Sequence, residues 1–233
     1  MRSVPMKPHR VASDQPTFLP WAGLFHKLIG IDLMIWSVAV PVSYGAKDHY
    51  HNRVRLNGSW LSLPITSKTD GVPFHQLRFD TKALPKIAKT LRNTFGKAYP
   101  YYKRVQSIAD LIDGWKNGDD LAYFNTGLIM AMSGSMASQD WHMLHDLVPP
   151  DPKLSKTERL IHRLRLAGSG PIEYYMGRGA IRYMDVELLK KANVSVFVQV
   201  LNERVKDESA LQLLASEGFP AIEIARMGHW EQL

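Results

Sequence analysis

The sequence predicts an α/β fold with a mainly parallel central sheet, a Rossmann-like strand–helix–strand start and a helical insert or second helical lobe. Two observations support this fold class. A strand pattern, a short helix and a second, continuously apolar strand follow one another between residues 10 and 40. Strand and helix patterns alternate again after residue 155, as they do in chains that form parallel sheets.

The composition is that of a globular protein with one sizeable core. The chain has 233 residues, of which 45% are hydrophobic and 22% are charged. We expect a flexible N-terminus at residues 1–10 and a single α/β domain at 11–233, with a helical insert at about 82–147 and a possible lobe boundary at 148–153. No apolar run approaches the roughly 20 residues that span a bilayer. Because cysteine is absent as well, we expect a cytoplasmic protein without disulfides.

The first three elements are expected to form a right-handed βαβ unit. A short strand is predicted in "RVASDQP", and Pro16 and Pro20 exclude regular strand pairing in the loop that follows it. Proline is tolerated in the first turn of a helix, so a helix is predicted to begin near Pro20 and to end at Gly30. The apolar run "DLMIWSVAV" then has the pattern of a strand that is covered on both faces.

The middle of the chain is expected to contain a hairpin and then helices. Asn57-Gly58 lies between the alternating segments "RVRL" and "WLSLPI", which is a strong hairpin signal. "FHQLRFD" is predicted to be another short strand because it alternates as well. Helical patterns follow at about 82–95, 104–117 and 119–133.

The C-terminal part is expected to alternate between helices and strands. "SKTERLIHRLRLAG" reads as a capped helix, because Ser155 stands three residues before Glu158 and Gly168 ends the pattern. We predict strands in "IEYYMG" and "VSVFVQV", helices at about 185–191 and in "ESALQLLASEG", and a final apolar segment, "PAIEIARM".

Basic residues are concentrated in one segment of the helical insert. No acidic residue occurs from Thr81 to Ala109, and the cations of this segment equal the net charge of +7 of the whole chain. Such a segment forms either a solvated helix face or a surface for phosphate-bearing partners. Tyr101 and Tyr102 could stack on bases or close the end of a core. The candidate nucleic-acid surface consists of Lys82, Lys86, Lys89, Arg92, Lys97, Tyr101, Tyr102, Lys103 and Arg104.

The candidate catalytic residues lie in and after the first strand. Ligands bind at the carboxyl ends of strands in open α/β sheets, and Asp14 and Gln15 stand at that end of the first predicted strand. His26 follows two turns into the first helix and is the third candidate, although its position also suits a histidine of the core.

Candidate phosphate-binding residues occur in the hairpin. Arg53 and Arg55 alternate along a strand, so they share a face and could hold one phosphate or carboxylate, with Asn52 beside them. An exposed strand face fits the same pattern. No metal site is predicted, because the neighbouring segment "DHYH" offers no further ligand at a defined spacing.

A second group of binding residues is expected in the C-terminal part. Arg159 and Arg163 share one face of a helix, and Tyr175, Gly177 and Arg178 belong to a turn that allows close approach of a ligand. No Ser-His-Asp order or paired-carboxylate spacing stands out, so covalent hydrolytic catalysis is not expected. We predict that one cleft at the carboxyl edge of the sheet collects Gln15, Asn52, Arg53, Arg55, Arg159 and Tyr175.

Several motifs resemble the WbqC-like protein family. The opening "QPTFLPWAGLFHKL" is its most specific motif, and it is followed in family order by "NRVRL", "WLSLPI", "YYKRV", "ERLIHRLRLAGSGPIEYYMGRGAIRYMD" and "ESALQLLASEG". The resemblance covers roughly residues 11–218. Asp14 stands where the family usually has histidine, and "VAVPV" replaces an acidic pair after the second strand. "TFLPWAGLFHKL" is also faintly similar to the histidine-containing turn of nucleotidyltransferases and pantothenate-synthetase-like ligases.

The resemblance implies a role in surface-sugar assembly or in phages, and hence in a bacterial host cell if a phage encodes the chain. Together with the basic segment, it leads us to expect a transferase or ligase that joins a small amine or amino-acid-like group to an anionic, phosphate-bearing acceptor. A hypermodified base in phage DNA is the favoured acceptor. A nucleotide sugar is the alternative acceptor, and a non-catalytic nucleic-acid-binding accessory is the alternative function. No cofactor is expected beyond a nucleotide or activated phosphate on the substrate, and no membrane partner.

Overall fold

A six-stranded sheet forms the centre of the computed structural model, which describes residues 8–42, 51–67, 69, 71–134, 142–202, 209–218 and 221–233. Its strands are β1 (His9–Asp14), β2 (Leu33–Ser37), β5 (His142–Asp146), β6 (Ile172–Gly177), β7 (Val194–Leu201) and β8 (Gly228–Gln232). They are ordered β5-β2-β1-β6-β7-β8, and all neighbours are parallel except β7 and β8. The predicted α/β class with a mainly parallel sheet is therefore confirmed.

The predicted βαβ start is confirmed too. Helix α1 (Ala22–Leu28) connects β1 to β2, and these two strands pair in parallel from Val11↔Leu33 to Asp14↔Trp36. The expected flexible N-terminus lies largely outside the described residues, and its last two positions, His9 and Arg10, already belong to β1.

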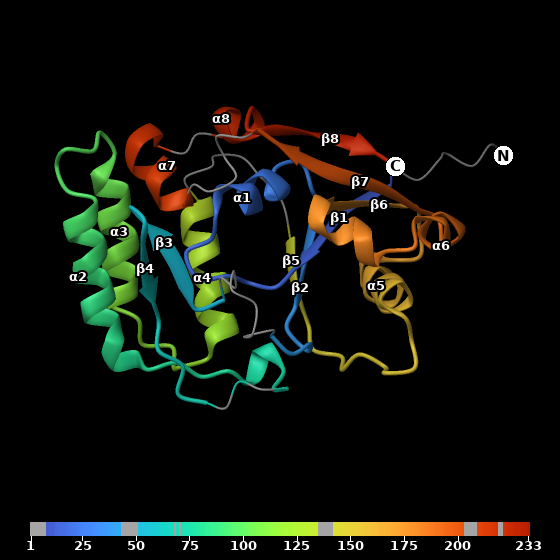
Figure 1. Cartoon of the computed structure of the whole chain (residues 1–233), viewed down its shortest axis with the longest axis horizontal. Helices are drawn as coiled ribbons and strands as arrows, with labels where there is room; N and C mark the ends of the chain where they lie inside the picture. Colours follow the sequence, from blue (N-terminus) through green and yellow to red (C-terminus); the bar gives the residue numbers. More distant parts are fainter. Residues whose placement is uncertain are drawn as a thin grey trace.

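Two helical layers cover the sheet (Figure 1). One face carries α5 (Lys156–Leu164) and α6 (Val186–Lys191), which bury a small core with β1, β2, β6 and β7. The other face carries a larger core, with α1 next to the sheet. That layer also contains α2 (Leu84–Thr94), α3 (Tyr102–Asp113), α4 (Leu121–Ser133), α7 (Ala210–Glu217) and α8 (Ala221–Ala225). The helices predicted between residues 82 and 133 are confirmed, and α2 and α3 lie outermost.

The predicted hairpin forms outside the central sheet. Strands β3 (Arg53–Leu56) and β4 (Ser59–Ser62) pair antiparallel, and Asn57 and Gly58 have φ values of 46° and 81°. Positive φ at both central residues is the geometry that Asn-Gly favours in a two-residue hairpin turn. Val54 and Leu56 face the large core, so Arg53 and Arg55 share the outer face as predicted.

The predicted strand in "FHQLRFD" is wrong. Residues Phe74–Gln76 form a short 3-10 helix, η1, which begins after Pro73. Phe74, Leu77 and Phe79 are all buried in the large core. Their spacing of three and then two residues does not follow the two-residue period that a half-buried strand requires. Two further 3-10 turns flank helices that were predicted, namely η2 (Thr81–Ala83) before α2 and η3 (Arg165–Ala167) after α5.

The C-terminal elements agree with the sequence, except that β8 was not predicted. Ser155 Oγ accepts a hydrogen bond from the Glu158 backbone at 3.2 Å, and the Glu158 carboxylate accepts one from the Ser155 backbone at 2.7 Å. This reciprocal cap begins α5 as expected. A six-residue 3-10 segment, η4 (Arg178–Tyr183), leads from β6 to α6. Across the described ranges, no helix is long and apolar enough to cross a membrane.

Candidate functional site

The candidate site lies at the carboxyl ends of β1 and β6, in the middle of the sheet. From β1 the chain turns to α1 on one face, whereas from β6 it turns to η4 and α6 on the other face. The register of these two strands, His9↔Ile172 to Ala12↔Tyr175, places Asp14 opposite Gly177 when it is continued. Such a reversal of strand order, with connections that leave on opposite faces, is the place where open α/β sheets bind ligands.

A buried lysine occupies this position. Lys27 Nζ, from α1, forms an ion pair with Asp14 Oδ2 at 2.6 Å, and its side chain is 7% exposed, against 37% for Asp14. A β-carbon at Gly177 would lie 3.6 Å from Nζ, which is ordinary van der Waals contact, so the ammonium packs directly against the end of β6. Burying an ammonium has a high desolvation cost, which the ion pair with Asp14 offsets.

Asp14 and Gln15 are linked to each other and to the end of β2. The second oxygen of Asp14, Oδ1, accepts a hydrogen bond from the Gln15 backbone at 3.0 Å. Gln15 Nε2 donates to the Val40 carbonyl at 3.3 Å. Both residues therefore lie at the carboxyl edge as predicted; Gly177 ends β6 opposite Asp14, and the exposed Arg178 follows it in the chain. We call Ser13, Asp14, Gln15, Lys27, Ser37 and Gly177 the edge site.

On the α5 face, polar side chains continue the edge site toward β5. Ser13 Oγ and Ser37 Oγ are 2.9 Å apart, and Ser37 pairs in register with Asp146. Asp146 Oδ2 accepts a hydrogen bond from Arg163 Nε at 2.7 Å. Burial raises the pKa of Tyr174, and so does the negative charge of Asp14, so its hydroxyl remains neutral near the edge site.

Arg159 and Arg163 line a pocket of about 220 Å³ beside Asp146, which we call the side pocket. Arg159 Nε donates to the Leu154 carbonyl at 2.9 Å, which fixes its position there. Apolar side chains of the segment between β5 and α5 form another part of the wall, and Asp151, His162 and Leu166 complete it. The two arginines therefore come together as expected, but on the α5 face and with one of them bound to Asp146.

His26 lies away from the edge site, between α1 and the strands β7 and β8. Gln199 Nε2 donates to its Nδ1 at 3.0 Å, and its ring stacks on Trp230 at 5.3 Å. Burial lowers the pKa of His26, and a hydrogen bond with the Gly228 backbone opposes that shift. These contacts are those of a neutral histidine that connects elements of the core.

The predicted single cleft does not form. Tyr175 stacks on Phe197, and its hydroxyl donates at 3.0 Å to Glu173, two residues nearer the amino end of β6. Burial and the neighbouring Glu173 raise the pKa of Tyr175 to about 12. Arg53 stacks over Trp60 on the hairpin, with 4.2 Å between the guanidinium carbon and the ring centre. Arg55 is exposed on the same face.

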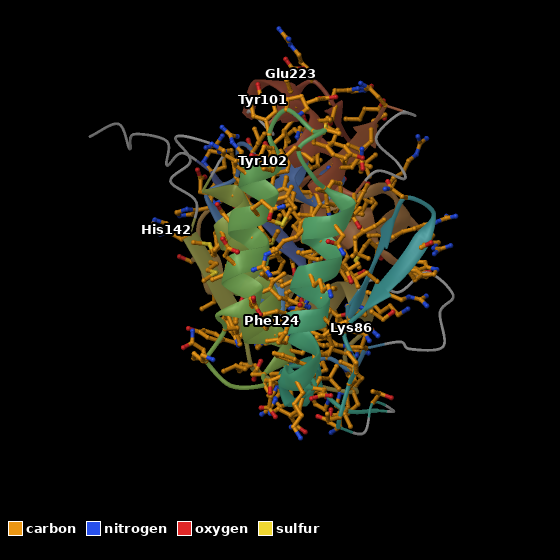
Figure 2. The ribbon with its side chains drawn as sticks, turned by 90° about the vertical axis from the view of Figure 1, so that its left-hand side faces the viewer. Lys86, Tyr101, Tyr102, Phe124, His142 and Glu223 are labelled. Carbon is orange, nitrogen blue, oxygen red and sulfur yellow. The ribbon has the colours of Figure 1, made fainter. Side chains whose placement is uncertain are left out.

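Part of the positive charge of the basic segment is compensated within the chain. Arg92 Nη2 forms ion pairs with Asp110 at 2.7 Å and Asp113 at 3.2 Å, both from α3. Arg104 donates to the Gly218 carbonyl and lies over the Tyr101 ring. The remaining cations are exposed; they are Lys82, Lys86, Lys89, Lys97 and Lys103. Figure 2 shows Tyr101 and Tyr102 at one end of the α2–α3 pair and Lys86 toward the other end.

Lys27 was not among the candidate site residues predicted from the sequence. All seven residues of α1 are buried, so its lysine stands in a helix that is covered all round. A charged residue in such a helix is a signal that the sequence already contained. Within the described ranges, no group of three or more His, Cys, Asp or Glu residues could hold a metal ion. Asp48 and His49 lie outside those ranges.

The fold and the edge site define a doubly wound α/β protein with a candidate ligand site where the order of its strands reverses. Neither a curated protein nor a solved structure matches the chain. The sequence model of the WbqC-like protein family matches residues 15–206, so the chain belongs to that family.

Proposed function

We propose that the protein is a transferase that holds a phosphate-bearing acceptor at the edge site and joins a small amine to it. The observation that carries this proposal is the Lys27–Asp14 ion pair at the point where the strand order reverses. An ammonium has three N–H donors, and Asp14 is the one hydrogen-bond acceptor found for Lys27 within the described residues. A phosphate oxygen of the acceptor can take a remaining donor.

In the proposed reaction the two charged groups have different roles. The amine nitrogen forms a bond to a carbon of the acceptor, while the bond from that carbon to a phosphate oxygen breaks. The phosphate leaves with the electron pair, and Lys27 stabilises the charge that develops on it. The proton of the amine passes to the carboxylate of Asp14, which is the more exposed member of the ion pair.

A small acceptor such as a nucleotide sugar is the first candidate. The sequence favoured DNA because of seven cations without nearby acidic residues, but Arg92 is paired with Asp110 and Asp113. The other cations lie on and around α2 and the start of α3, the outermost helices of their layer, rather than on α1 beside the edge site (Figure 1). Few phosphate contacts are needed for a mononucleotide, and Lys27 supplies one of them.

DNA is the second candidate, either as a modified-base acceptor or as the partner of a non-catalytic accessory. The exposed lysines support it, because each phosphate that a lysine neutralises releases counterions and adds to affinity. Tyr101 is exposed at the end of this surface, where it could stack on a base.

Titration calorimetry with two variants distinguishes these candidates. A nucleoside diphosphate sugar and a short DNA duplex are titrated into the native protein, into Lys27→Met, and into the combined variant Lys82→Gln, Lys86→Gln, Lys89→Gln. A hydrogen bond to a charged group contributes about 1.5–3 kcal/mol, so Lys27→Met should weaken sugar-nucleotide binding about 10- to 100-fold. The lysine variant should bind it normally. Unchanged binding by Lys27→Met would remove the edge site from the proposal.

A further inference from the structure

The side pocket lies apart from the edge site. Asp146, on the wall of the pocket, ends β5, whereas Asp14 ends β1, and β2 separates these two strands. Neighbouring strands lie about 4.8 Å apart, so about 10 Å separate the two positions. The pocket is built on the α5 face, whereas Lys27 comes from α1 on the other face. A molecule the size of one amino acid in the side pocket therefore does not reach Lys27.

Arg159, which lines this cavity, has hydrogen-bond donors to spare. A guanidinium carries five N–H donors, and Nε of Arg159 donates to the Leu154 carbonyl at 2.9 Å. This bond holds the group in place. Neither of its Nη atoms has a hydrogen-bond partner among the described residues, and no carboxylate pairs with it there. The free end of a guanidinium matches the two oxygens of a carboxylate.

An opposite charge lines the same cavity. Asp151 is exposed, and its Oδ1 accepts a hydrogen bond from the Lys153 backbone at 2.9 Å. In the part of the chain that the structure describes, Asp151 forms no ion pair with Arg159 or with another cation. Asp146 and Arg163, in contrast, neutralise each other at 2.7 Å. One cation and one carboxylate therefore share the pocket and remain available to a ligand that carries both charges.

The rest of the wall favours a small ligand with an apolar part. Val148 is 56% exposed and Leu166 is 46% exposed, so both offer apolar surface that a ligand could cover. Ligand sites combine such surface with a few polar groups, and those for drug-sized ligands measure roughly 300–1,000 Å³. The volume of about 220 Å³ suits a smaller molecule. The other lining side chains are Pro149, Pro150, Leu154 and His162.

We propose that the side pocket binds a free α-amino acid with an apolar side chain. Its carboxylate binds Arg159, and its ammonium group faces Asp151. Its side chain covers Val148 and Leu166. A phosphate would bring its negative charge next to Asp151, and the C-terminus of a peptide would offer Asp151 an uncharged amide in place of an ammonium group. This inference goes beyond the proposed transfer at the edge site and does not depend on it.

Nuclear magnetic resonance with L-leucine as the probe tests the site. The backbone amide signals of Val148 and Leu154 and the Nε–H signal of Arg159 are followed during titration of the ¹⁵N-labelled protein. We expect saturable shifts of these signals. Isoamylamine, which lacks the carboxylate, should bind about tenfold or more weakly. N-acetyl-L-leucine, which lacks the ammonium group, should bind about two- to fivefold more weakly, because Asp151 is exposed.

Three outcomes of this titration would overturn the proposal. The first is the lack of saturation with L-leucine. The second is equal affinity for L-leucine and N-acetyl-L-leucine, which would indicate a peptide C-terminus as the ligand. The third is equal affinity for L-leucine and isoamylamine, which would show that Arg159 binds no carboxylate.

Two variants assign the charges to their residues. Asp151→Asn keeps the oxygen that accepts from Lys153 and removes the charge. It should lower L-leucine affinity about two- to fivefold and leave N-acetyl-L-leucine affinity unchanged. Arg159→Met should weaken both ligands about tenfold or more. Arg226→Met is the control, because Arg226 is an exposed arginine that pairs with Glu223 after α8. L-leucine affinities of Asp151→Asn and Arg159→Met equal to that of the control would contradict the assignment.

Lys27→Met separates this inference from the proposed function. It should reduce binding of the nucleoside diphosphate sugar and leave L-leucine binding unchanged. Saturating L-leucine should not displace the sugar nucleotide from the native protein. Displacement would place both ligands in one site and contradict a separate amino-acid site, whereas loss of nucleotide binding alone would concern only the edge site.

Discussion

Two buried ion pairs at the same edge of the sheet differ in which member reaches solvent. In the Lys27–Asp14 pair the cation is 7% exposed and the carboxylate 37%. In the Arg163–Asp146 pair the arginine is 15% exposed and the carboxylate 7%. Both carboxylates also accept a backbone hydrogen bond, Asp146 from Val148 at 3.1 Å and Asp14 from Gln15 at 3.0 Å, so the two pairs differ in exposure and not in the number of engaged oxygens. The first pair can present its carboxylate to a bound molecule, whereas the second is closed and stabilises the link between β5 and α5.

Removal of one partner from the closed pair should have the largest effect. Arg163→Met would leave the Asp146 carboxylate buried without its cation, and such changes destabilise proteins by about 3–5 kcal/mol. The free energy of unfolding, measured with urea, should fall by that amount. The double variant with Asp146→Leu should recover most of the loss. A loss below about 1 kcal/mol in the single variant would show that this pair is not closed.

Lys27→Met should separate binding from stability. The expected 10- to 100-fold loss of sugar-nucleotide affinity should come with a change in unfolding free energy within about 1 kcal/mol, because the remaining Asp14 carboxylate reaches solvent. The same urea titration measures this change. A destabilisation equal to that of Arg163→Met would mean that the two pairs have the same structural role and that the comparison fails.

The core histidine His26 should make the free energy of unfolding depend on pH. Burial lowers the pKa of His26 in the folded protein, so the unfolded chain binds the extra proton first as the pH falls below about 6.5. Burial shifts the pKa of His145 in the same direction. Stability should therefore be full above that pH and decline below it. Urea unfolding between pH 7.5 and 5.5 should show a shallower decline for His26→Gln; an unchanged slope would contradict the role of His26 in the core.

The smallest effect on sugar-nucleotide affinity is expected from substitutions on and beside the outer helix α2. The combined variant Lys82→Gln, Lys86→Gln, Lys89→Gln should change sugar-nucleotide affinity less than twofold, because these exposed side chains lie on another layer of the molecule. If DNA is a partner, the slope of log affinity against log salt should fall by about three, one unit for each lysine that contacts a phosphate. A larger loss of sugar-nucleotide affinity would show that the basic segment is part of the acceptor site.

The order of β1, α1 and β2, the hairpin and the three helices of the insert could be predicted, because each has a strong local signal. Strand β5 has none: His142 and His145 interrupt its short apolar pattern, and Met143 and Leu144 are exposed at the edge of the sheet. Asp146, and with it the closed ion pair, therefore depended on a strand that the sequence did not reveal.

The candidate site could be predicted in part. Ligand sites in open α/β sheets lie at the carboxyl ends of strands, so the end of β1 could be predicted as a site position. Asp14 and Gln15 do lie at that end. The alternating pattern of β6 does not indicate whether the Tyr175 side chain leans toward the amino or the carboxyl end of the strand. In the structure its hydroxyl donates a hydrogen bond to Glu173, toward the amino end. Asn52 Nδ2 donates to the Leu63 carbonyl at 2.8 Å, so this candidate joins the two ends of the hairpin. The alternation that predicted the hairpin does not show which side-chain contacts close it.

A crystal structure of the protein with a bound nucleoside diphosphate sugar tests the central claim most directly. We predict a phosphate oxygen at hydrogen-bond distance, about 2.7–3.2 Å, from Lys27 Nζ, with Asp14 facing the carbon that carries the phosphate. A nucleotide bound in the side pocket against Arg159, with Lys27 still paired to Asp14 alone, would contradict it.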